Sequence, residues 1–564
     1  MDVAFTVFVG DISSGNYPQT APAKAIRGLN YPSYFPNCHT PIPNKRKTKT
    51  KVLIMAVLIT LLSAVAIAWG LNLLYAIWWR PKTIEQQLWK QGIHGHPYKL
   101  IHGNIKEMIK LAKERGSKPV EQPHDILPRL NPLLHDLVTT YKKSFVIWYG
   151  TTPRVAIMEP DLIKEILSNK SGDFPKPDIN SFTQLFVTGL ASYNGDKWAK
   201  HRKIVNPAFH IEKLKHMLPA FVVCTEELIE KWSKLVNFMG SCEVDMSVEF
   251  QNLTGDVISR AAFGSNFEVG RLIFLLQKEQ GSLFLQSQMS INFPWLRFLP
   301  TKVNKRMRHI HQEVGSLLTG IIENREKVIG SGDHKDDLLG LLLKSNLDEL
   351  QDKKHSNSRM TTEDVIEECK LFYFAGQETT ANLLTWTMIV LSMHTDWQER
   401  AREEVLQVFG RNKLAYDDLN RLKIVNMILL EVLRLYPSTP LIRRTYKETK
   451  LGNLCLPAGV QLFMPLHLVH RDTEQWGEDA TEFKPERFSE GILKATKDRI
   501  SYFPFGWGPR ICVGQNFAML ESKLALARIL QNFSFELSPT YTHAPYAAVT
   551  LQPQYGAQII LHKL

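Results

Sequence analysis

The sequence predicts a mainly α-helical protein with a small β region, built as one large domain behind an N-terminal transmembrane helix. Apolar residues recur at helical spacing through most of residues 98–564, whereas the clearest β pattern is a pair of apolar runs around a turn at 144–158. Residues 52–79 are almost wholly apolar. With 564 residues, 44% hydrophobic and 22% charged, the chain has enough apolar material for one large core, and nothing after residue 98 indicates a second domain.

The N-terminal region divides into three predicted parts. Residues 1–51 are polar and lack sustained periodicity, so we expect a disordered extension or a misassigned start, with Met55 as the native first residue. Residues 52–79 are long enough, at roughly 1.5 Å per residue, to span a bilayer. A cleaved signal peptide is the alternative, but the run is too long for one and no small-residue cleavage site follows it. Residues 80–97 are expected to be a linker to the domain.

The charge and cysteine content exclude several classes of function. The formal net charge is +12, but five of the basic residues lie within 45–51 and the remainder is only mildly basic. A membrane surface or an acidic protein partner is therefore favoured over nucleic acid. The six cysteines include no C-x-x-C pair, which argues against a disulfide scaffold and against a zinc ribbon.

A glycine-rich loop at 503–514 is the most specific motif in the chain. Gly506 and Gly508 permit positive φ and close backbone approach, so the loop can fold tightly around the sulfur of Cys512. Helical apolar spacing begins just after this cysteine, and a helix N-terminus lowers the pKa of a thiol and stabilises the thiolate. A lone cysteine of this kind is more often a small buried hydrophobe, but the fixed spacing of the surrounding residues favours a metal ligand or a nucleophile.

This loop, Phe-x-x-Gly-x-Arg-x-Cys-x-Gly from Phe505 to Gly514, resembles the haem-binding loop of the cytochrome P-450 family. The resemblance implies that haem b is the cofactor and that Cys512 is the axial ligand of its iron. It also implies that Arg510 pairs with a haem propionate and that Phe505 packs near the ligand loop. A thiolate ligand favours O–O cleavage over O₂ storage, so the resemblance implies oxygen activation.

Further cationic residues match propionate contacts of the same family. Trp198 and Arg202 lie four residues apart on one predicted helical face. In isolation they would indicate a surface helix with a packed tryptophan, but by resemblance Trp-x-x-x-Arg lies over a propionate. The segment 438–444 places a third contact at Arg444 or, as the alternative, at Arg443. Buried propionates need such cationic partners.

A long helix is predicted from Thr361, which forms a capping-box signal with Asp364. Its middle, 375–380, contains glycine and two threonines, which lower helix propensity and indicate a local break with a functional cause. By resemblance, this is the helix above the iron, and Glu378 and Thr379 manage proton delivery to the bound oxygen, while the small residues leave room for O₂.

A buried charge network is implied by the same resemblance. Glu431 and Arg434 are spaced to pair on one helical face, and Arg487 lies in the downstream Pro-Glu-Arg-Phe segment. By themselves these residues would be ordinary surface charges, but together they match the Glu-Arg-Arg network of the family, whose role is scaffolding. The sequence His-Arg-Asp beginning at His470 is also interpreted as structural.

The resemblance is strongest to the plant clan that includes secologanin-synthase-like, brassinosteroid-inactivating and cytokinin-hydroxylating enzymes. It implies a membrane-anchored monooxygenase that oxidises a lipophilic terpenoid, steroid or hormone-like substrate with O₂ and with electrons from an NADPH-dependent reductase. A haem-thiolate isomerase or dehydratase that uses no O₂, and a non-enzymatic haem carrier or sensor, stay open as alternatives. Retention of Glu378 and Thr379 argues against both, because neither needs a proton relay.

The family places the catalytic domain on the cytosolic side of the endoplasmic reticulum membrane, with a single-pass anchor. The basic residues at 45–51 outnumber those just after the anchor, so the positive-inside rule alone predicts the opposite orientation. A native start at Met55 would remove the conflict. The apolar segment 291–301 is interpreted either as core packing under a loop or as a second membrane contact.

Overall fold

The computed structural model describes residues 45–116, 120, 123–178, 181–264, 267–289, 301–330, 337–351, 360–410, 416–497 and 500–564. The prediction of disorder for residues 1–44, and nearly all of the apolar segment at 291–301, therefore fall outside the described residues. The chain divides into two compact units, residues 1–70 and residues 71–564. The first unit contains most of the anchor and the second contains the domain.

The anchor is helical, as the sequence predicts. Helix α1 (Lys45–Leu74) continues through a short π-helical turn, Tyr75–Trp79. Within the described part of the chain, Leu53–Trp89 is the only helical stretch long and apolar enough to cross a membrane. Its large apolar side chains as far as Trp79 are exposed, which is the surface that a lipid bilayer would cover.

The segment 80–97, predicted to be a linker, is instead part of the domain. Helix α2 (Arg80–Trp89) begins with a proline at its first turn, where a missing N–H costs nothing, and buries Ile84 and Leu88. The buried Glu85 carboxylate accepts hydrogen bonds from the Tyr98 backbone N–H and from the Lys82 ammonium. The prediction missed the apolar face because it occupies only one side of a short polar helix.

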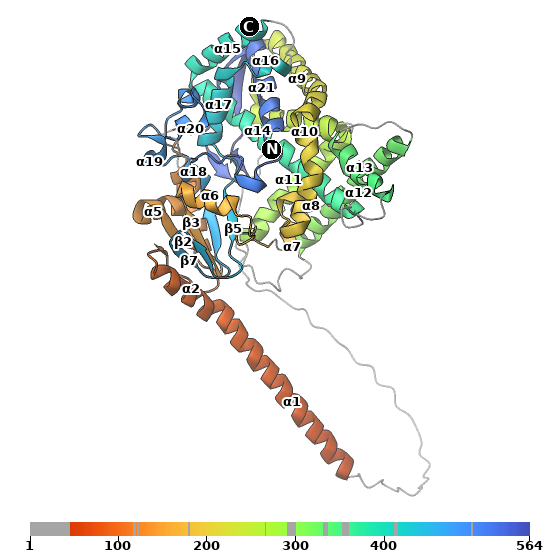
Figure 1. Ribbon diagram of the computed structural model, residues 1–564, viewed down its shortest axis with the longest axis vertical. Coiled ribbons are helices and arrows are strands. Elements are labelled where there is room, and N and C mark those ends of the chain that lie inside the picture. The colour runs from red at the N-terminus through yellow and green to blue at the C-terminus, as the bar shows by residue number, and fades with distance from the viewer. Residues whose placement is uncertain are drawn as a thin grey trace, which may run out of the picture. The chain divides into compact units, whose positions relative to one another are not determined.

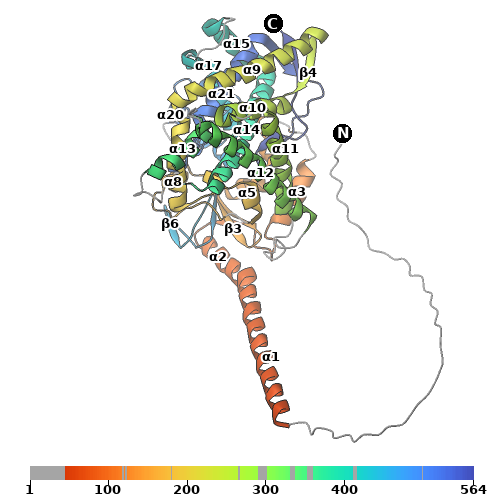
Figure 2. The same ribbon diagram turned by 90° about the vertical axis from the view of Figure 1, so that its right-hand side faces the viewer.

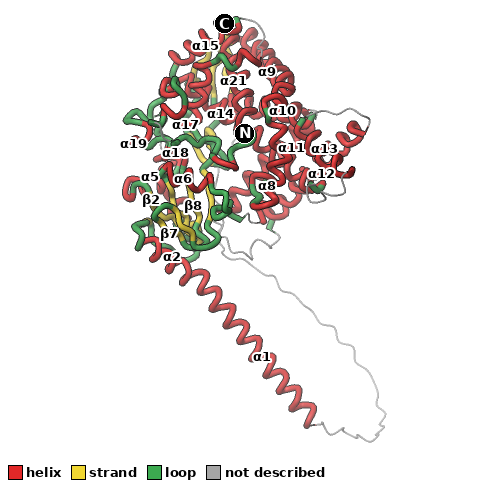
Figure 3. Tube along the Cα trace, in the orientation of Figure 1, coloured by secondary structure: helices red, strands yellow, loops and turns green. Residues whose placement is uncertain are grey.

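In the described part of the chain the strands form four small sheets, which confirms the predicted small β region. The predicted turn at 144–158 is the antiparallel β2–β3 hairpin, within a sheet of order β1-β2-β3-β8-β5. A three-stranded sheet has the order β4-β12-β9, and the pairs β6-β7 and β10-β11 complete the set. Figure 3 shows the five-stranded sheet gathered at one end of the domain, apart from most helices. The strands are β1 His94–Gly95, β2 Ser144–Tyr149, β3 Thr152–Ile157, β4 Ser241–Asp245, β5 Leu441–Arg444, β6 Thr449–Leu451, β7 Leu454–Leu456, β8 Gln461–Met464, β9 Phe533–Leu537, β10 Pro545–Ala547, β11 Leu551–Pro553 and β12 Gln558–Lys563.

Helices make up most of the domain and surround a long central one, α14, in both views (Figures 1 and 2). The helices up to the centre are α3 Ile105–Gly116, α4 Leu127–Leu130, α5 Pro132–Tyr141, α6 Pro160–Ser168, α7 Ser181–Phe186, α8 Gly195–Val205, α9 Ile211–Met239, α10 Met246–Phe263, α11 Phe267–Met289, α12 Lys302–Gly330 and α13 Leu338–Gln351. From the centre onward they are α14 Thr362–Met393, α15 Thr395–Phe409, α16 Tyr416–Leu419, α17 Lys423–Leu435, α18 Leu466–Val469, α19 Thr473–Trp476, α20 Ile492–Ala495 and α21 Gln515–Asn532.

Helix α14 begins as predicted. The Thr361 hydroxyl accepts from the Asp364 N–H at 3.0 Å, and the Asp364 carboxylate accepts from the Thr361 N–H at 3.2 Å, so the capping box is complete. The predicted break at 375–380 is wrong, because the helix runs without interruption to Met393. Gly376 serves helix packing: a Cβ there would lie 2.9 Å from the Ile258 side chain of α10.

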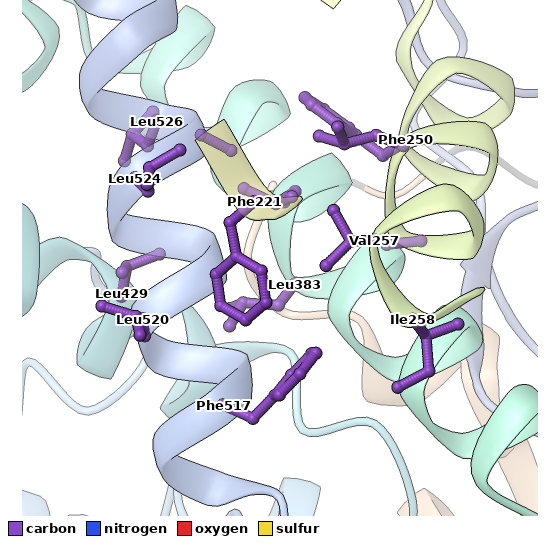
Figure 4. Close-up of a cluster of buried hydrophobic side chains, with 14 of the residues drawn as sticks. Phe221, Phe250, Val257, Ile258, Leu383, Leu429, Phe517, Leu520, Leu524 and Leu526 are labelled. Carbon is purple, nitrogen blue, oxygen red and sulfur yellow. The ribbon is translucent and has the colours of Figure 1, made fainter. Parts of the chain in front are cut away.

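The largest apolar cluster joins α9, α10, α14, α17 and α21. In Figure 4, Phe221 of α9 lies between Phe517 and Leu524 of α21 on one side and Val257 of α10 on the other, with Leu383 of α14 beside them. Each such side chain contributes about 1.5–3 kcal/mol when it is buried. This packing fixes α21, and with it the loop that immediately precedes the helix.

Candidate active site

The glycine-rich loop folds tightly around the backbone of Cys512, with the positive-φ glycines that the sequence predicts. Gly506 and Gly508 have φ values of 75° and 70°, and the Cys512 N–H donates to the Phe505 carbonyl at 2.8 Å. A Cβ on Gly508 would lie 2.5 Å from the carbonyl oxygen of Leu167, so only glycine fits there. The loop therefore holds Cys512 by its backbone, three residues before the first residue of α21.

The electrostatics of the thiol differ from the expectation in one respect. Cys512 is exposed, yet desolvation by the surrounding protein raises the pKa of its thiol, and this effect outweighs the Gly514 N–H and the Arg202 and Lys176 cations, which all lower it. The helix N-terminus alone predicts a lowered pKa, because it does not include desolvation by the rest of the fold. Among the described residues, no group of three or more His, Cys, Asp or Glu side chains could hold a metal ion.

Four basic side chains, Lys176, Arg202, Arg443 and Arg510, form a cluster around this thiol that lacks acidic partners. The Arg510 guanidinium donates to the Tyr193 carbonyl at 3.0 Å and to Asn194 Oδ1 at 3.1 Å. The other three donate to the main-chain carbonyls of Ile511 (from Arg202), Ile442 (from Arg443) and Ala191 (from Lys176). None of the four forms an ion pair with a carboxylate in the described parts of the chain.

Burial and neighbouring positive charges lower the pKa values of three of these cations. Burial, together with the nearby Arg443 and Arg510, lowers the pKa of Lys176 to about 7. Burial, together with Arg510, lowers the pKa of Arg443 to about 10, and burial with Arg202 does the same for Arg510. Arg443 is buried and the other three cations are half-buried, and positive charges removed from water without counter-charges are unfavourable, so the cluster is complementary to an anionic ligand. A ligand carrying both carboxylates and a metal for the thiolate fits these residues, and haem b has both.

The other predicted cofactor residues lie as follows. Trp198 and Arg202 both lie on α8, and the Arg510 guanidinium sits over the Trp198 ring, 4.3 Å from its centroid. The Phe505 side chain packs half-buried against the large core cluster, while its carbonyl holds the loop.

Arg443 and Arg444 are the two predicted alternatives for the third propionate contact, and their side chains have different surroundings. Arg444 pairs with Asp178 and lies over the Tyr446 ring at 4.3 Å, away from the cluster. Arg443 is 6% exposed and interacts with Arg510, so the geometry favours Arg443, which the prediction had ranked second. Because β5 alternates its faces, a shift of one residue decides which arginine reaches the site.

Lys176 was missed by the sequence analysis. It lies between Pro175 and Pro177, and the Pro175 carbonyl accepts from the Arg444 N–H at 2.9 Å, which ties this segment to β5. Two prolines around a lysine make a stiff extended segment, and that signal could have indicated a positioned cation.

On α14, Glu378 and Thr379 have separate surroundings. The Thr379 hydroxyl donates to the Ala375 carbonyl, one turn earlier, at 2.7 Å. The Glu378 Oε1 accepts from the Thr550 hydroxyl at 2.6 Å, from the Asn382 amide at 3.2 Å and from the Gln552 amide. Thr550 and Gln552 were not foreseen, because they approach α14 from the C-terminal part of the chain.

The predicted charge network is assembled behind the thiol loop. Glu431 and Arg434 are both fully buried, at Nε–Oε2 2.7 Å and Nη2–Oε1 2.8 Å, and the Arg487 Nε donates to Glu431 Oε1 at 3.0 Å. The remaining N–H groups of Arg434 donate to main-chain carbonyls, one of them that of His470. His470 Nε2 accepts from the Phe503 N–H at 3.0 Å, which links the network to the loop.

Comparison with known proteins decides the family. The family model described as Cytochrome P450 matches residues 128–560. The chain belongs to the cytochrome P450 family. It is 54% identical to cytochrome P450 CYP72A616 of Paris polyphylla over 91% of this chain and 99% of that protein. It is 53% identical to 11-oxo-beta-amyrin 30-oxidase of Glycyrrhiza uralensis, over 91% of this chain and 98% of that protein.

Other matches agree with this P450 assignment. Secologanin synthase 1 of Catharanthus roseus is 49% identical over 89% of this chain and 96% of its own length. A solved structure, retinoic acid bound cyanobacterial CYP120A1, has a TM-score of 0.66 and 23% identity over 76% of this chain and 94% of that chain, which shows the shared fold. The chain is thus a haem-thiolate P450 monooxygenase that uses O₂ to oxidise a lipophilic small molecule.

Proposed function

We propose that this P450 is a membrane-anchored monooxygenase that oxidises a terpenoid with electrons from an NADPH-dependent reductase. In the balanced reaction, one atom of O₂ enters a C–H bond of the substrate. The other leaves as water, with two electrons and two protons. The observation that carries the proposal is the Cys512 thiol beside a cluster of one buried and three half-buried cations, none of which pairs with a carboxylate of the described residues.

In this proposal, Cys512 is the iron ligand, and Arg510, Arg202 and Arg443 bind the haem propionates together with Lys176. Bound haem would supply the iron at which O₂ is activated, and the thiolate ligand favours O–O cleavage. Trp198 supports Arg510 through its ring, and Phe505 supports the Cys512 N–H through its carbonyl. Two propionates would relieve the repulsion that lowers the pKa values of these cations.

We propose that Glu378 and Thr379 handle the protons of this reaction. They lie next to each other on α14, and the Thr379 hydroxyl is held at the Ala375 carbonyl. A carboxyl group can take up and release a proton, and a hydroxyl can donate to bound oxygen and accept in turn. Glu431, Arg434 and Arg487 are proposed to act only as the scaffold of the thiol loop, through His470 and Phe503.

A terpenoid substrate is supported by the relatives and by an aromatic cluster near Glu378. The ring of Phe186, at the end of α7, stacks on Phe284 of α11 at 5.5 Å and meets Phe374 of α14 edge-on at 4.9 Å. Phe374 lies one helical turn before Glu378. Apolar surroundings of this kind favour a lipophilic molecule. Two relatives are named for terpenoid oxidations, as an amyrin oxidase and as secologanin synthase.

The apolar helix supports a membrane anchor. We propose that this anchor lies in the endoplasmic reticulum membrane with the catalytic domain in the cytosol, where an NADPH-dependent reductase would meet it. We propose residues 98–564, together with the packed segment 80–97, as the catalytic domain, and residues 52–79 as the membrane-crossing part. The residues before the membrane-crossing part are then either an N-terminal extension or sequence upstream of a native start at Met55. Mass spectrometry of the native N-terminus tests this start, and abundant peptides from residues 2–45 would contradict it.

The test of the function is turnover in microsomes that contain this P450 and a plant reductase, with a panel of terpenoids and ¹⁸O₂. We expect a product that carries one ¹⁸O atom and forms only when NADPH and the reductase are both present. Substrate conversion without NADPH and O₂ would instead identify an isomerase or dehydratase. No conversion of any panel member by well-folded protein would overturn the terpenoid assignment.

A further inference from the structure

The Glu378 carboxylate accepts hydrogen bonds from a part of the chain that lies far along the sequence. Thr550, one of the donors, is 172 residues further on. Strands β10 and β11 form a hairpin with Ala547 opposite Leu551, so its tight turn contains residues 548–550. The turn places Thr550 against α14, where its side chain is only 3% exposed. Gln552, two residues further along β11, also reaches Glu378.

The hydrogen bonds that the described residues donate to this carboxylate all reach the same oxygen atom. Oε1 accepts from Thr550, Gln552 and Asn382, whereas Oε2 accepts from no described residue. The Thr550 hydroxyl in turn accepts from the Asn382 amide at 2.8 Å. A carboxylate bound in this way has one oxygen fixed in position and the other available for a proton.

The hairpin that supplies these donors is itself fixed. The Trp386 indole N–H of α14 donates to the Leu551 carbonyl at 3.0 Å, and the Leu551 N–H donates to the Ser438 carbonyl at 3.1 Å. On its outer side, the Tyr546 hydroxyl donates to Gln552 Oε1 at 3.1 Å, so both ends of the Gln552 amide are used. The donors therefore have little freedom to turn away from Glu378.

We propose that the β10–β11 hairpin is the positioning element of the proton-delivery acid. Thr550 and Gln552 hold Oε1 of Glu378, and this leaves Oε2 to exchange the proton during turnover. Thr550 and Gln552 are positioning residues and take no proton themselves. This inference rests on the proposed role of Glu378. If either donor is lost, the carboxylate turns away, protons arrive too slowly, and O₂ reduced by two electrons with two protons leaves as H₂O₂ instead of oxidising the substrate.

The first experiment measures H₂O₂ released per NADPH consumed, with the panel terpenoid that the enzyme converts fastest. Thr550→Val keeps the shape and removes the hydroxyl, and Gln552→Leu removes the amide; each should raise the peroxide share several-fold and increase the solvent isotope effect on product formation in D₂O. Thr550→Ser should restore both values to near those of the wild type. The substrate Kd, measured by the Soret shift, should change less than twofold.

Matched controls lie near the same hairpin. Gln554→Leu removes an amide that accepts from Arg129 instead of facing Glu378, and Thr540→Val removes a hydroxyl that bonds Ser538 and Glu243. Both should keep the wild-type peroxide share. An equal rise in these controls would show a general loosening of the C-terminal region and would overturn the proposal.

A comparison with Glu378→Gln separates this inference from the proposed function. If Glu378→Gln raises the peroxide share and Thr550→Val and Gln552→Leu do not, the hairpin has no positioning role and the role of Glu378 stands. If Glu378→Gln leaves the peroxide share unchanged, both the role of Glu378 and this inference are wrong.

A second experiment does not depend on turnover. In a double-mutant cycle on thermal unfolding, Glu378→Ala and Thr550→Val should together lower Tm by clearly less than the sum of their single effects, because each removes the same hydrogen bond. Glu378→Ala combined with Thr540→Val should be additive. Additive shifts in the first pair would contradict a hydrogen bond between Glu378 and Thr550.

Discussion

Arg443 and Arg444 are adjacent in sequence, yet one belongs to the cation cluster and the other to a surface ion pair. Arg443→Gln should therefore loosen haem binding, because a charge-assisted hydrogen bond to a propionate contributes about 1.5–3 kcal/mol, or about 10- to 100-fold in affinity. Arg444→Gln is the matched control and should retain haem like the wild type. Haem transfer to apomyoglobin measures the loss rate, and faster loss from Arg444→Gln than from Arg443→Gln would reverse the assignment.

Glu521 on α21 is a second residue whose surroundings decide its behaviour. It is 2% exposed, and neither carboxylate oxygen has a hydrogen-bond partner within the described residues, so burial raises its pKa well above the ordinary value. The folded protein keeps this proton at pH values where the unfolded chain has lost it. Stability therefore falls as the pH rises above about 4.3, by about 1.4 kcal/mol per pH unit, until the folded-state pKa is reached.

Glu521→Gln should remove this pH dependence, because the amide stays neutral at every pH. We expect the variant to gain stability over the wild type as the pH rises from 5 to 8, when unfolding is followed in urea at each pH. Glu490→Gln, at an exposed position, should follow the wild-type curve. Parallel curves for Glu521→Gln and the wild type would mean that Glu521 is ionised in the folded protein.

At the scale of elements, the thiol loop requires Gly506 and Gly508 for different physical reasons. Both have positive φ, but a Cβ on Gly506 would meet its nearest atom at 4.0 Å, whereas a Cβ on Gly508 would lie 2.5 Å from the Leu167 carbonyl. Gly506→Ala should cost about 1–2 kcal/mol from backbone strain alone. Gly508→Ala should cost more and should lower the haem content of purified protein. Equal haem content and Tm in the two variants would mean that the loop can move away from α6.

On the continuous helix α14, the Thr379 hydroxyl donates a hydrogen bond to the backbone of its own helix. Thr379→Ala removes one hydrogen bond, to the Ala375 carbonyl, so the fold and haem binding should persist. The reducing equivalents should then be diverted, with H₂O₂ per NADPH rising several-fold while the haem spectrum stays unchanged. Thr387→Ala, which removes the equivalent bond to Leu383 two turns later, is the control and should keep the wild-type coupling. Unchanged coupling in Thr379→Ala would remove this residue from proton delivery.

The elements that the sequence predicts well are those with local signals. The β2–β3 hairpin, the Thr361 capping box and the start of α21 each follow from residues within a few positions of one another. Composition alone does not predict that α14 is continuous. The low helix propensity of its middle segment is compensated by contacts with another helix. The Thr254 hydroxyl of α10 donates to the Gln377 carbonyl at 2.9 Å, within the segment where a break was expected.

At the scale of the whole molecule, the site is assembled from segments that only the fold brings together. Lys176 precedes α7, Arg443 lies on β5 and Arg510 precedes α21, and their common surroundings could not be inferred from spacing. The family pattern predicts roles for Cys512, Glu378 and Thr379 because each sits in a short motif. Thr550 and Gln552 carry no motif, so only their contacts with α14 indicate a role.

The absorption spectrum of the reduced, CO-bound protein in microsomes shows whether Cys512 ligates haem iron as a thiolate. The wild type should show a strongly red-shifted Soret band. Cys512→Ala should lose that band, whereas Cys455→Ala, at an exposed cysteine on β7, should keep it. A red-shifted band that persists in Cys512→Ala, or its absence from well-folded wild-type protein, would contradict thiolate ligation by Cys512.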